Sequence, residues 1–180
     1  MILKKDHERV CEKINYNIED IIVKKKLVDN GKIFVAKFGG MKGQWDNEMN
    51  SLLILYKKKH FPVLLSKDSD KLIFFVNYCG KTLENNNIPI DWKLQLNEII
   101  QTLKKYCISH NDMHGFGNFL VHNDILNLID FGWGTHCHNY PFKNINEEDL
   151  LKHNDFIELL DQVCKRSIEE RITANLWIYK

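Results

Sequence analysis

The sequence predicts an α+β fold in which a small antiparallel sheet comes first and helices follow. Short runs rich in β-branched and aromatic residues occupy 21–38 and 61–78, and apolar residues recur with helical spacing over 45–59 and 91–106. A chain of 180 residues with 44% hydrophobic content can bury one substantial core, or two small lobes that share a cleft. We therefore expect one folding unit over residues 1–180.

The firmest local prediction is a β-hairpin over residues 21–38. Asn30-Gly31 separates two apolar runs, and both residues tolerate the positive φ that a type I′ turn requires. Side chains alternate along a strand, so Val35 and Lys37 share one face of the second strand. Lys37 therefore ends an apolar stripe.

The sheet is expected to continue after an amphipathic helix over 45–59. Glu48 lies beside the apolar face of this helix, so its carboxylate can point inward. Two more β-rich runs, FPVLL (61–65) and LIFFVNY (72–78), extend the sheet, and the polar stretch 66–70 between them predicts a turn.

Helices dominate the second half of the chain. Asp91 is expected to cap a helix that reaches Tyr106. A polar loop over 109–118 and a strand pair between 119 and 130 follow. Asn146 precedes three acidic residues, which suit the positive end of a helix dipole, so another helix is expected there.

Composition bounds the partners and the location. Lys and Arg number 25 against 24 Asp and Glu, a net charge of +1, which favours neither nucleic acid nor an anionic membrane as partner. Five scattered cysteines without a CxxC pair argue for a reducing compartment. No apolar run approaches the ~20 residues of a membrane span, and the start MILKKDHERVCEK is too charged for a signal peptide. We expect a cytoplasmic protein, and the composition favours no particular oligomeric state.

One stretch, residues 109–134, carries the chemistry: SHNDMHGFGNFLVHNDILNLIDFGWG. It contains His-x-Asp, an Asn six residues after that Asp, two short apolar runs and then Asp-Phe-Gly. This stretch resembles the catalytic loop and the metal loop of the protein-kinase-like superfamily. The HNDMH form looks closer to the HxDxH loops of haspin-like, small-molecule and compact atypical kinases than to the HRD loop of large regulated protein kinases. The resemblance implies that His110 supports the loop structurally.

Other parts of the chain occur in the order that such a fold requires. Val35-Ala36-Lys37 resembles the strand-three lysine motif, and Glu48 resembles the helix-C glutamate. The segment 77–83 is similar to the hinge that joins the two lobes. These likenesses fall in the expected sequence along the chain, which makes a chance match of all of them improbable.

The resemblance covers roughly residues 20–135 and implies a two-lobed protein-kinase-like fold. The N-lobe, about residues 1–79, would hold the small antiparallel sheet and helix C. The C-lobe, about residues 80–180, would be helical and reduced, because fewer than 50 residues follow the Asp-Phe-Gly motif.

This likeness implies an ATP- and Mg²⁺-dependent phosphotransferase. Phosphoryl transfer passes through a loose transition state, so positioning and cations matter more than covalent chemistry. Lys37 would bind the α- and β-phosphates and form an ion pair with Glu48. Asp112 would orient the acceptor hydroxyl and accept its proton. Asn118 and Asp130 would hold Mg²⁺ through hard oxygen ligands.

Adenine would lie against the hinge. The resemblance implies that backbone groups at Asn77 and Cys79 form hydrogen bonds with the base. Val35, Val76 and Leu120 would provide apolar walls on either side of it.

Three features depart from the family pattern. The step from Asp112 to Asn118 is one residue longer than usual, which makes Asp130 the principal metal ligand. No GxGxxG precedes the hairpin, so the phosphates would be less closely covered. Asn111 stands where large kinases carry the arginine that reads a phosphorylated activation loop, so we do not expect switching by loop phosphorylation.

The acceptor and the activity itself have alternatives. A minimal Ser/Thr protein kinase is the first hypothesis, with a small-molecule kinase of the choline or aminoglycoside type as the second. In both cases the acceptor is a hydroxyl group, of a protein or of a small molecule. A pseudokinase that serves as a binding module is the third hypothesis, and an unrelated α+β interaction protein is the fourth.

Overall fold

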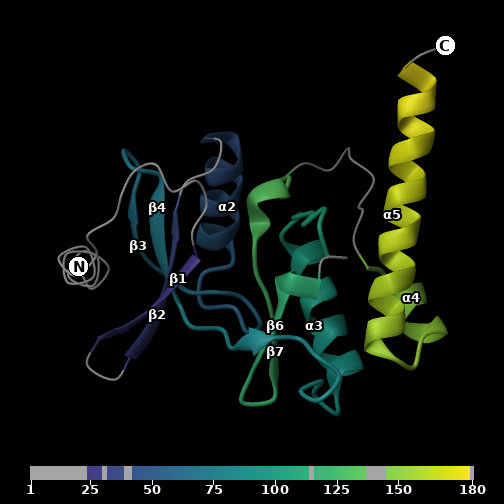
Figure 1. The fold of residues 1–180 in the computed structure, drawn as a ribbon, viewed down its shortest axis with the longest axis horizontal. Coiled ribbons are helices and arrows are strands. Elements are labelled where there is room, and N and C mark those ends of the chain that lie inside the picture. Colours follow the sequence, from purple (N-terminus) through teal and green to yellow (C-terminus); the bar gives the residue numbers. More distant parts are fainter. Residues whose placement is uncertain (1–23, 30–31, 39–41, 114–115, 137–144, 179–180) are drawn as a thin grey trace.

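The computed structural model shows an α+β protein, as predicted, with two small antiparallel sheets and four α-helices among the described residues (Figure 1). The backbone is described for residues 24–29, 32–38, 42–113, 116–136 and 145–178, and side chains for 42–113, 117–136 and 145–169. In Figure 1 the first sheet and α2 lie on one side, the second sheet and α3 in the middle, and α4 and α5 on the other side.

The first sheet has four strands in the order β1-β2-β4-β3. All neighbours in it are antiparallel. Its strands are β1 (Lys24–Asp29), β2 (Lys32–Phe38), β3 (Leu64–Asp68) and β4 (Ile73–Asn77). The predicted hairpin is confirmed, because β1 and β2 pair with Asp29 opposite Lys32. The Asn30-Gly31 turn itself lies outside the described residues.

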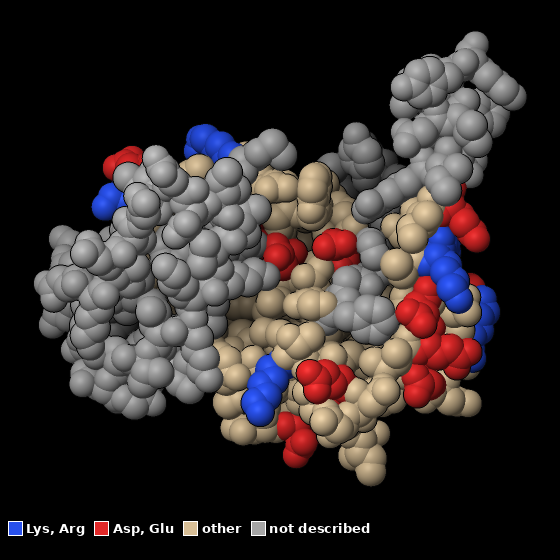
Figure 2. Space-filling model, viewed as in Figure 1, with Lys and Arg blue, Asp and Glu red and all other residues tan. Residues whose placement is uncertain are grey.

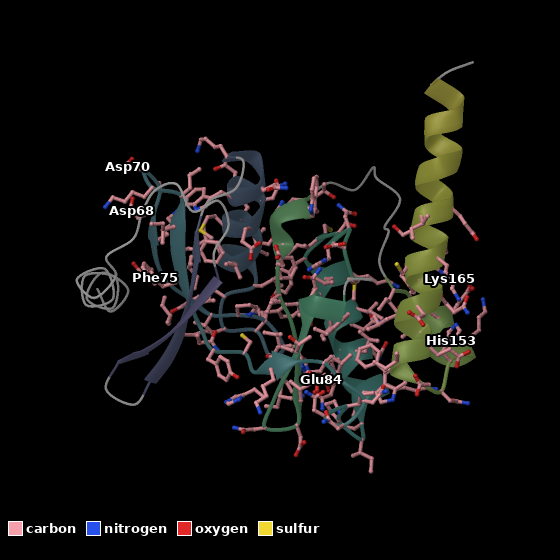
Figure 3. All side chains as sticks on the ribbon, in the orientation of Figure 1. Asp68, Asp70, Phe75, Glu84, His153 and Lys165 are labelled. Atoms are coloured by element: carbon pink, nitrogen blue, oxygen red, sulfur yellow. The ribbon has the colours of Figure 1, made fainter. Side chains whose placement is uncertain are left out.

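The turn expected over 66–70 is wrong in its position, because β3 continues to Asp68. Ser66 is buried while Lys67 is exposed, so these polar residues follow the alternation of a strand. The turn comes next, and the Asp68 carboxylate accepts the N–H of Asp70 at 3.1 Å. Figure 3 shows Asp68 and Asp70 at the outer end of the sheet.

Helix α2 (Lys42–Ile54) begins and ends earlier than the predicted range 45–59. Beyond it the backbone turns left-handed at Lys57 and His60, with φ of 57° and 71°, and an L-residue helix cannot continue through such conformations. The helix packs on the first sheet through a group that we call the N-terminal cluster: Trp45, Met49, Leu52, Leu64, Phe74 and Val76.

The second sheet has the order β5-β6-β7 and includes a strand that the sequence did not predict. Its strands are β5 (Lys81–Thr82), β6 (Phe119–His122) and β7 (Ile125–Leu128). The chain reaches β5 through Gly80, whose φ is +114°. A Cβ on Gly80 would lie 2.0 Å from the carbonyl oxygen of Val121, so only glycine fits this close crossing.

Three helices complete the described part of the fold: α3 (Trp92–Lys105), α4 (Glu147–Lys152) and α5 (Phe156–Ile178). Asp91 precedes α3 as expected, but its side chain forms no capping bond and instead accepts the Gln95 Nε2 amide at 2.6 Å. The predicted helix start at Asn146 is confirmed, because Asn146 and Asp149 form a reciprocal capping box.

The larger core lies between α3, the second sheet, α4 and α5. Trp92 stacks on Phe156 with ring centroids 4.7 Å apart, and Phe119 meets Phe156 edge-on at 5.3 Å. We call this group the C-terminal cluster; its buried residues are Leu55, Phe61, Leu83, Trp92, Leu96, Ile99, Ile100, Leu103, Ile108, Met113, Phe119, Leu126, Leu128, Phe131, Ile145, Leu150, Phe156, Leu159, Leu160 and Val163.

Within the described ranges, no helix has the length and apolar character needed to cross a membrane.

Candidate functional site

Two loops that meet beside the second sheet carry two of the predicted site residues, Asp112 and Asp130. The first, residues 109–113, follows α3, and the second, residues 129–136, follows β7. Ser109 and Thr135 join them as an antiparallel bridge, with each N–H donating to the other's carbonyl at 2.9 Å. The loop that carries Asp112 and the loop that carries Asp130 are therefore fixed against each other.

His110 supports this arrangement from inside the protein, as the sequence predicted. Its ring is fully buried, and the Nε2–H donates to the Ile129 carbonyl at 2.8 Å. The N–H of Asp112 donates to Nδ1 at 3.3 Å, so Nδ1 is the acceptor in this arrangement. The ring also meets Phe131 edge-on, with centroids 4.7 Å apart. His110 thus links the backbone at Asp112 to the residue before Asp130.

Asn118 ties the same two loops together from the other end. It ends the short 3₁₀ helix η1 (Phe116–Asn118), and it is 8% exposed. Its Nδ2 amide donates to the Asp112 carboxylate at 2.8 Å and to the Asp112 carbonyl at 2.9 Å. Its own carbonyl accepts the N–H of Ile129 at 2.9 Å. Both amide hydrogens are used on Asp112, which leaves the Oδ1 end of the amide as an oxygen ligand.

Asp130 sits at a sharp change of backbone direction. Its φ of 69° and ψ of 68° are left-handed, a conformation that Asp adopts more readily than most residues, and it leads into the 3₁₀ helix η2 (Phe131–Trp133). Phe131 is fully buried and belongs to the C-terminal cluster. The buried phenyl ring therefore anchors the turn that presents the Asp130 carboxylate.

Helix α2 is attached to this turn by hydrogen bonds that the sequence did not reveal. The Asn47 amide donates to the Gly132 carbonyl at 3.1 Å. Ser51 Oγ donates to the Asn47 carbonyl at 2.8 Å, so it accepts from His136 Nε2 at 3.1 Å. Glu48 lies between Asn47 and Ser51 on the helix and is 3% exposed, which confirms that it points inward.

Lys37 and Val35 can be placed only by their backbones, since their side chains lie outside the described ones. In the first sheet Lys37 is opposite Phe74, and Val35 is opposite Val76. Lys37 therefore belongs to the sheet on which α2 packs. The ion pair between Lys37 and Glu48 stays a prediction.

The residues predicted to contact adenine lie on both sheets. Val76 is 8% exposed and packs in the N-terminal cluster, while Leu120 on β6 is half-buried. Asn77 uses its side-chain oxygen to accept the Val63 N–H at 2.5 Å, so its side chain has a structural role. None of these contacts tests the predicted binding of the base.

Cys79 joins the two sheets at the predicted hinge. Its carbonyl accepts the Asn127 amide of β7 at 3.0 Å, a link between distant residues that local spacing could not predict. Burial raises the pKa of the Cys79 thiol to about 12. The thiol is therefore protonated at neutral pH and is a packing group here, not a nucleophile.

Figure 2 shows Asp and Glu side chains in the middle of the face that it presents, and further acidic side chains lie with Lys and Arg side chains in its lower part and along its edges. Within the described residues, no group of three or more His, Cys, Asp and Glu side chains could hold a metal ion.

Comparison with known proteins gives no independent guide to function. No protein-family model matches the chain, and no curated protein matches it significantly. The interpretation of the site therefore depends on its residues and their geometry.

Proposed function

We propose that the chain is an ATP- and Mg²⁺-dependent phosphotransferase with a two-lobed protein-kinase-like fold. In this proposal the first sheet and α2 form the N-lobe, and the second sheet with α3, α4 and α5 forms the C-lobe. The observation that carries the proposal is the joining of Asp112, Asn118 and the Asp130 turn through His110 and Asn118. Three residues of the kinds that phosphoryl transfer uses, two Asp and one Asn, are thereby linked in one hydrogen-bonded unit.

Asp112 is the proposed catalytic base. The Asn118 amide holds one of its carboxylate oxygens at 2.8 Å, and the His110 ring accepts its backbone N–H. The second carboxylate oxygen would orient the acceptor hydroxyl and take its proton. The hydroxyl oxygen would then bond to the γ-phosphorus while the bond from that phosphorus to the β,γ-bridging oxygen breaks and ADP leaves. A base held in this way pays little entropy when the substrate binds.

The donor set fits Mg²⁺ and the phosphates of ATP. Asp130 offers a carboxylate and Asn118 offers a side-chain carbonyl, both hard oxygen ligands of the kind that Mg²⁺ prefers. When bound, Mg²⁺·ATP supplies the γ-phosphoryl group with part of its negative charge neutralised. Lys37 would hold the α- and β-phosphates, and Glu48, buried on α2, would hold the Lys37 ammonium in place.

The nucleotide base would lie between the two sheets. Backbone groups of Asn77 and Cys79 would bind adenine, with Val35, Val76 and Leu120 as apolar walls. The Asn127 amide donates to the Cys79 carbonyl at 3.0 Å and fixes the hinge relative to β7. We further propose a cytoplasmic Ser/Thr protein kinase, with a small-molecule hydroxyl as the alternative acceptor.

The direct test is transfer of ³²P from [γ-³²P]ATP with Mg²⁺, using generic Ser/Thr protein acceptors in one series and choline and aminoglycosides in another. The wild-type chain should label an acceptor in one series, and Asp130→Asn should abolish labelling while the fold survives. Asp161→Asn, which changes an exposed carboxylate on α5, is the matched control and should keep full activity. Equal labelling by Asp130→Asn and wild type would remove Asp130 from the site. A chain that binds Mg²⁺·ATP but labels nothing would be a pseudokinase.

A further inference from the structure

Three lysines gather on two tyrosine rings where α2 and α3 end. The Lys58 and Lys105 ammonium groups lie over the Tyr106 ring, with Nζ 5.3 and 5.8 Å from the ring centroid. The Lys57 ammonium lies over the Tyr56 ring at 5.2 Å. Lys57 and Lys58 follow α2, Lys105 ends α3, and all three are exposed. We call these three lysines and two rings the lysine patch.

The backbone under the lysine patch is anchored in the larger core. Leu55 is fully buried in the C-terminal cluster, and its carbonyl accepts the Lys58 N–H at 2.9 Å. His60 is buried just beyond the lysines, and its ring bonds to the Leu126 carbonyl at 2.6 Å. Tyr106 packs against the same cluster and is partly buried. The patch therefore stands on a fixed backbone, which lowers the entropy cost of binding a partner.

The lysine patch carries positive charge that its surroundings leave unneutralised. Two further lysines on the same turn and helix end are paired with carboxylates, Lys59 with Glu98 and Lys104 with Glu147. Within the described part of the chain, the three patch lysines form no ion pair. The patch therefore has an unpaired excess of cations on an otherwise balanced surface.

Tyr106 is the centre of the patch, because two of the three ammonium groups lie over its ring. The Lys58 ammonium close to the phenol group lowers the pKa of Tyr106 below its usual value. The electrostatic potential at this ring is therefore positive. An anion that binds here would meet two ammonium groups and the phenol O–H, all of which donate hydrogen bonds.

The observations favour a short acidic segment over a long polyanion. Lysine ammonium groups are compact charges that bind carboxylate or phosphate oxygens. The whole chain has a net charge of only +1, so the rest of the molecule is on balance negative and would repel nucleic acid or an anionic membrane. The ammonium groups also lie over the tyrosine rings, where nucleic-acid bases would otherwise stack.

We propose that the lysine patch is a docking site for a short acidic segment of a partner protein. Carboxylate or phosphate groups of the segment would bind Lys58 and Lys105 over the Tyr106 ring, and a neighbouring acidic group would bind Lys57. This docking site is independent of the proposed function, since no residue of the patch belongs to the proposed catalytic or nucleotide-binding groups.

Two matched pairs of substitutions separate the lysine patch from net charge. Lys58→Met with Lys105→Met removes two patch ammonium groups and keeps side chains of similar shape. Lys67→Met with Lys165→Met removes the same charge from exposed positions on β3 and α5 (Figure 3). The Lys67 ammonium also lies over an aromatic ring, that of Trp45, at 5.7 Å, so it is a close control.

The first measurement is fluorescence anisotropy with a labelled octaglutamate peptide at low salt, where exposed ion pairs are least screened. Wild type should bind the peptide, and the patch pair of substitutions should weaken binding about tenfold. The control pair should change the affinity less than about twofold. No binding by wild type, or an equal loss in both pairs, would overturn the proposal.

Two further probes decide the class of partner: an oligothymidylate of equal charge, and vesicles of phosphatidylcholine with phosphatidylserine. Wild type that binds either probe more tightly than octaglutamate would overturn the choice of a protein segment.

Hydrogen exchange locates the bound peptide. Octaglutamate should slow exchange over residues 56–60 and 104–108 and leave β3 and β4 unchanged. Protection that is confined to other segments would contradict the proposal. These readouts need neither ATP nor transfer, so a failure of the proposed function leaves the docking site standing, and a failure of docking leaves the proposed function untouched.

Discussion

The two regions of the molecule contribute to the site in different ways. Met113, Phe119 and Phe131 belong to the C-terminal cluster and flank Asp112, Asn118 and Asp130 in the chain. Glu48 comes from α2, which packs on the first sheet through the smaller N-terminal cluster. The proposed acceptor and metal groups are therefore built into a core, whereas the proposed phosphate-binding groups approach from a second region.

Polar contacts set the position of that second region. The buried ring of His60 bonds to the Leu126 carbonyl at 2.6 Å, and the His60 carbonyl accepts the Leu128 N–H at 2.9 Å. Asn127 bonds to Cys79, and Asn47 bonds to Gly132. Because the two regions are held together by these polar contacts, the proposed acceptor contact at Asp112 and the proposed phosphate contact at Lys37 should be separable by mutation.

The largest expected effect is on turnover in Asp112→Asn. The amide keeps an oxygen for the Asn118 bond but cannot accept the hydroxyl proton, so turnover should fall about 10²–10⁴-fold. Affinity for ATP should change little, because the contact proposed for Asp112 is with the acceptor and not with the phosphates. Turnover and ATP affinity are measured on the same preparation. Unchanged turnover would remove Asp112 from the mechanism, and a parallel loss of affinity and stability would assign it a structural role.

The next largest effect is on stability, and it should differ between the two clusters. Phe119→Ala removes a fully buried ring from the C-terminal cluster and should cost about 3–5 kcal/mol of global stability. Leu52→Ala, equally buried in the N-terminal cluster, should cost about 2–4 kcal/mol. Its loss should appear first as faster hydrogen exchange in α2 and β4. Denaturant unfolding and hydrogen exchange check both variants. Identical exchange patterns would mean that the two regions open as one unit.

A smaller effect concerns the crossing between the two sheets. Gly80→Ala should destabilise the protein by at least about 2 kcal/mol, because alanine is strained at a φ of +114° and its Cβ would overlap Val121. Gly43→Ala is the matched control: its Cβ would meet nothing within 4 Å, and α2 should gain about 0.5–1 kcal/mol. Equal stability of the two variants would show that the crossing adjusts at no cost.

The smallest effect depends on pH. Burial lowers the pKa of His136 below its usual value, so the unfolded chain binds this proton more readily than the folded one. The stability that the neutral ring contributes is present above the ordinary histidine pKa and is lost as the pH falls through the lowered value. His136→Gln can still donate to Ser51 but does not titrate. In this variant the free energy of unfolding, measured with urea, should fall less steeply over this pH range. If stability fell more steeply at low pH in the variant than in wild type, folding would raise the pKa of His136 and not lower it.

Local patterns in the sequence predicted the α+β class, the first hairpin, the inward position of Glu48 and the capped start at Asn146. These depend on neighbours in the chain, which periodicity and turn chemistry report directly. The start of the turn after β3 was misplaced, because polar Ser66 and Lys67 follow the alternation of a strand. The end of α2 was misplaced because apolar spacing does not reveal the left-handed backbone at Lys57 and His60. Strand β5 could not be predicted, since two residues become a strand only by pairing with distant β6.

The same limit applies to the site. The spacing of His110, Asp112 and Asp130 suggested that they act together, but it gave no sign of the bonds that hold them. The contacts of Asn47 with Gly132 and of Asn127 with Cys79 join residues that lie far apart in the sequence. Single Asn residues on a helix and on a strand carry no local signal of such partners.

The central claim is that one Mg²⁺·ATP molecule contacts both regions, and calorimetric titration of three chains tests it most directly. Wild type, Lys37→Met and Asp130→Asn are titrated with ATP in the presence of Mg²⁺ and again in its absence. Lys37→Met should weaken binding about tenfold or more in both conditions, because it removes a charged phosphate contact. Asp130→Asn should weaken binding only when Mg²⁺ is present. Wild-type binding that does not depend on Mg²⁺, or equal affinities in all three chains, would contradict the account.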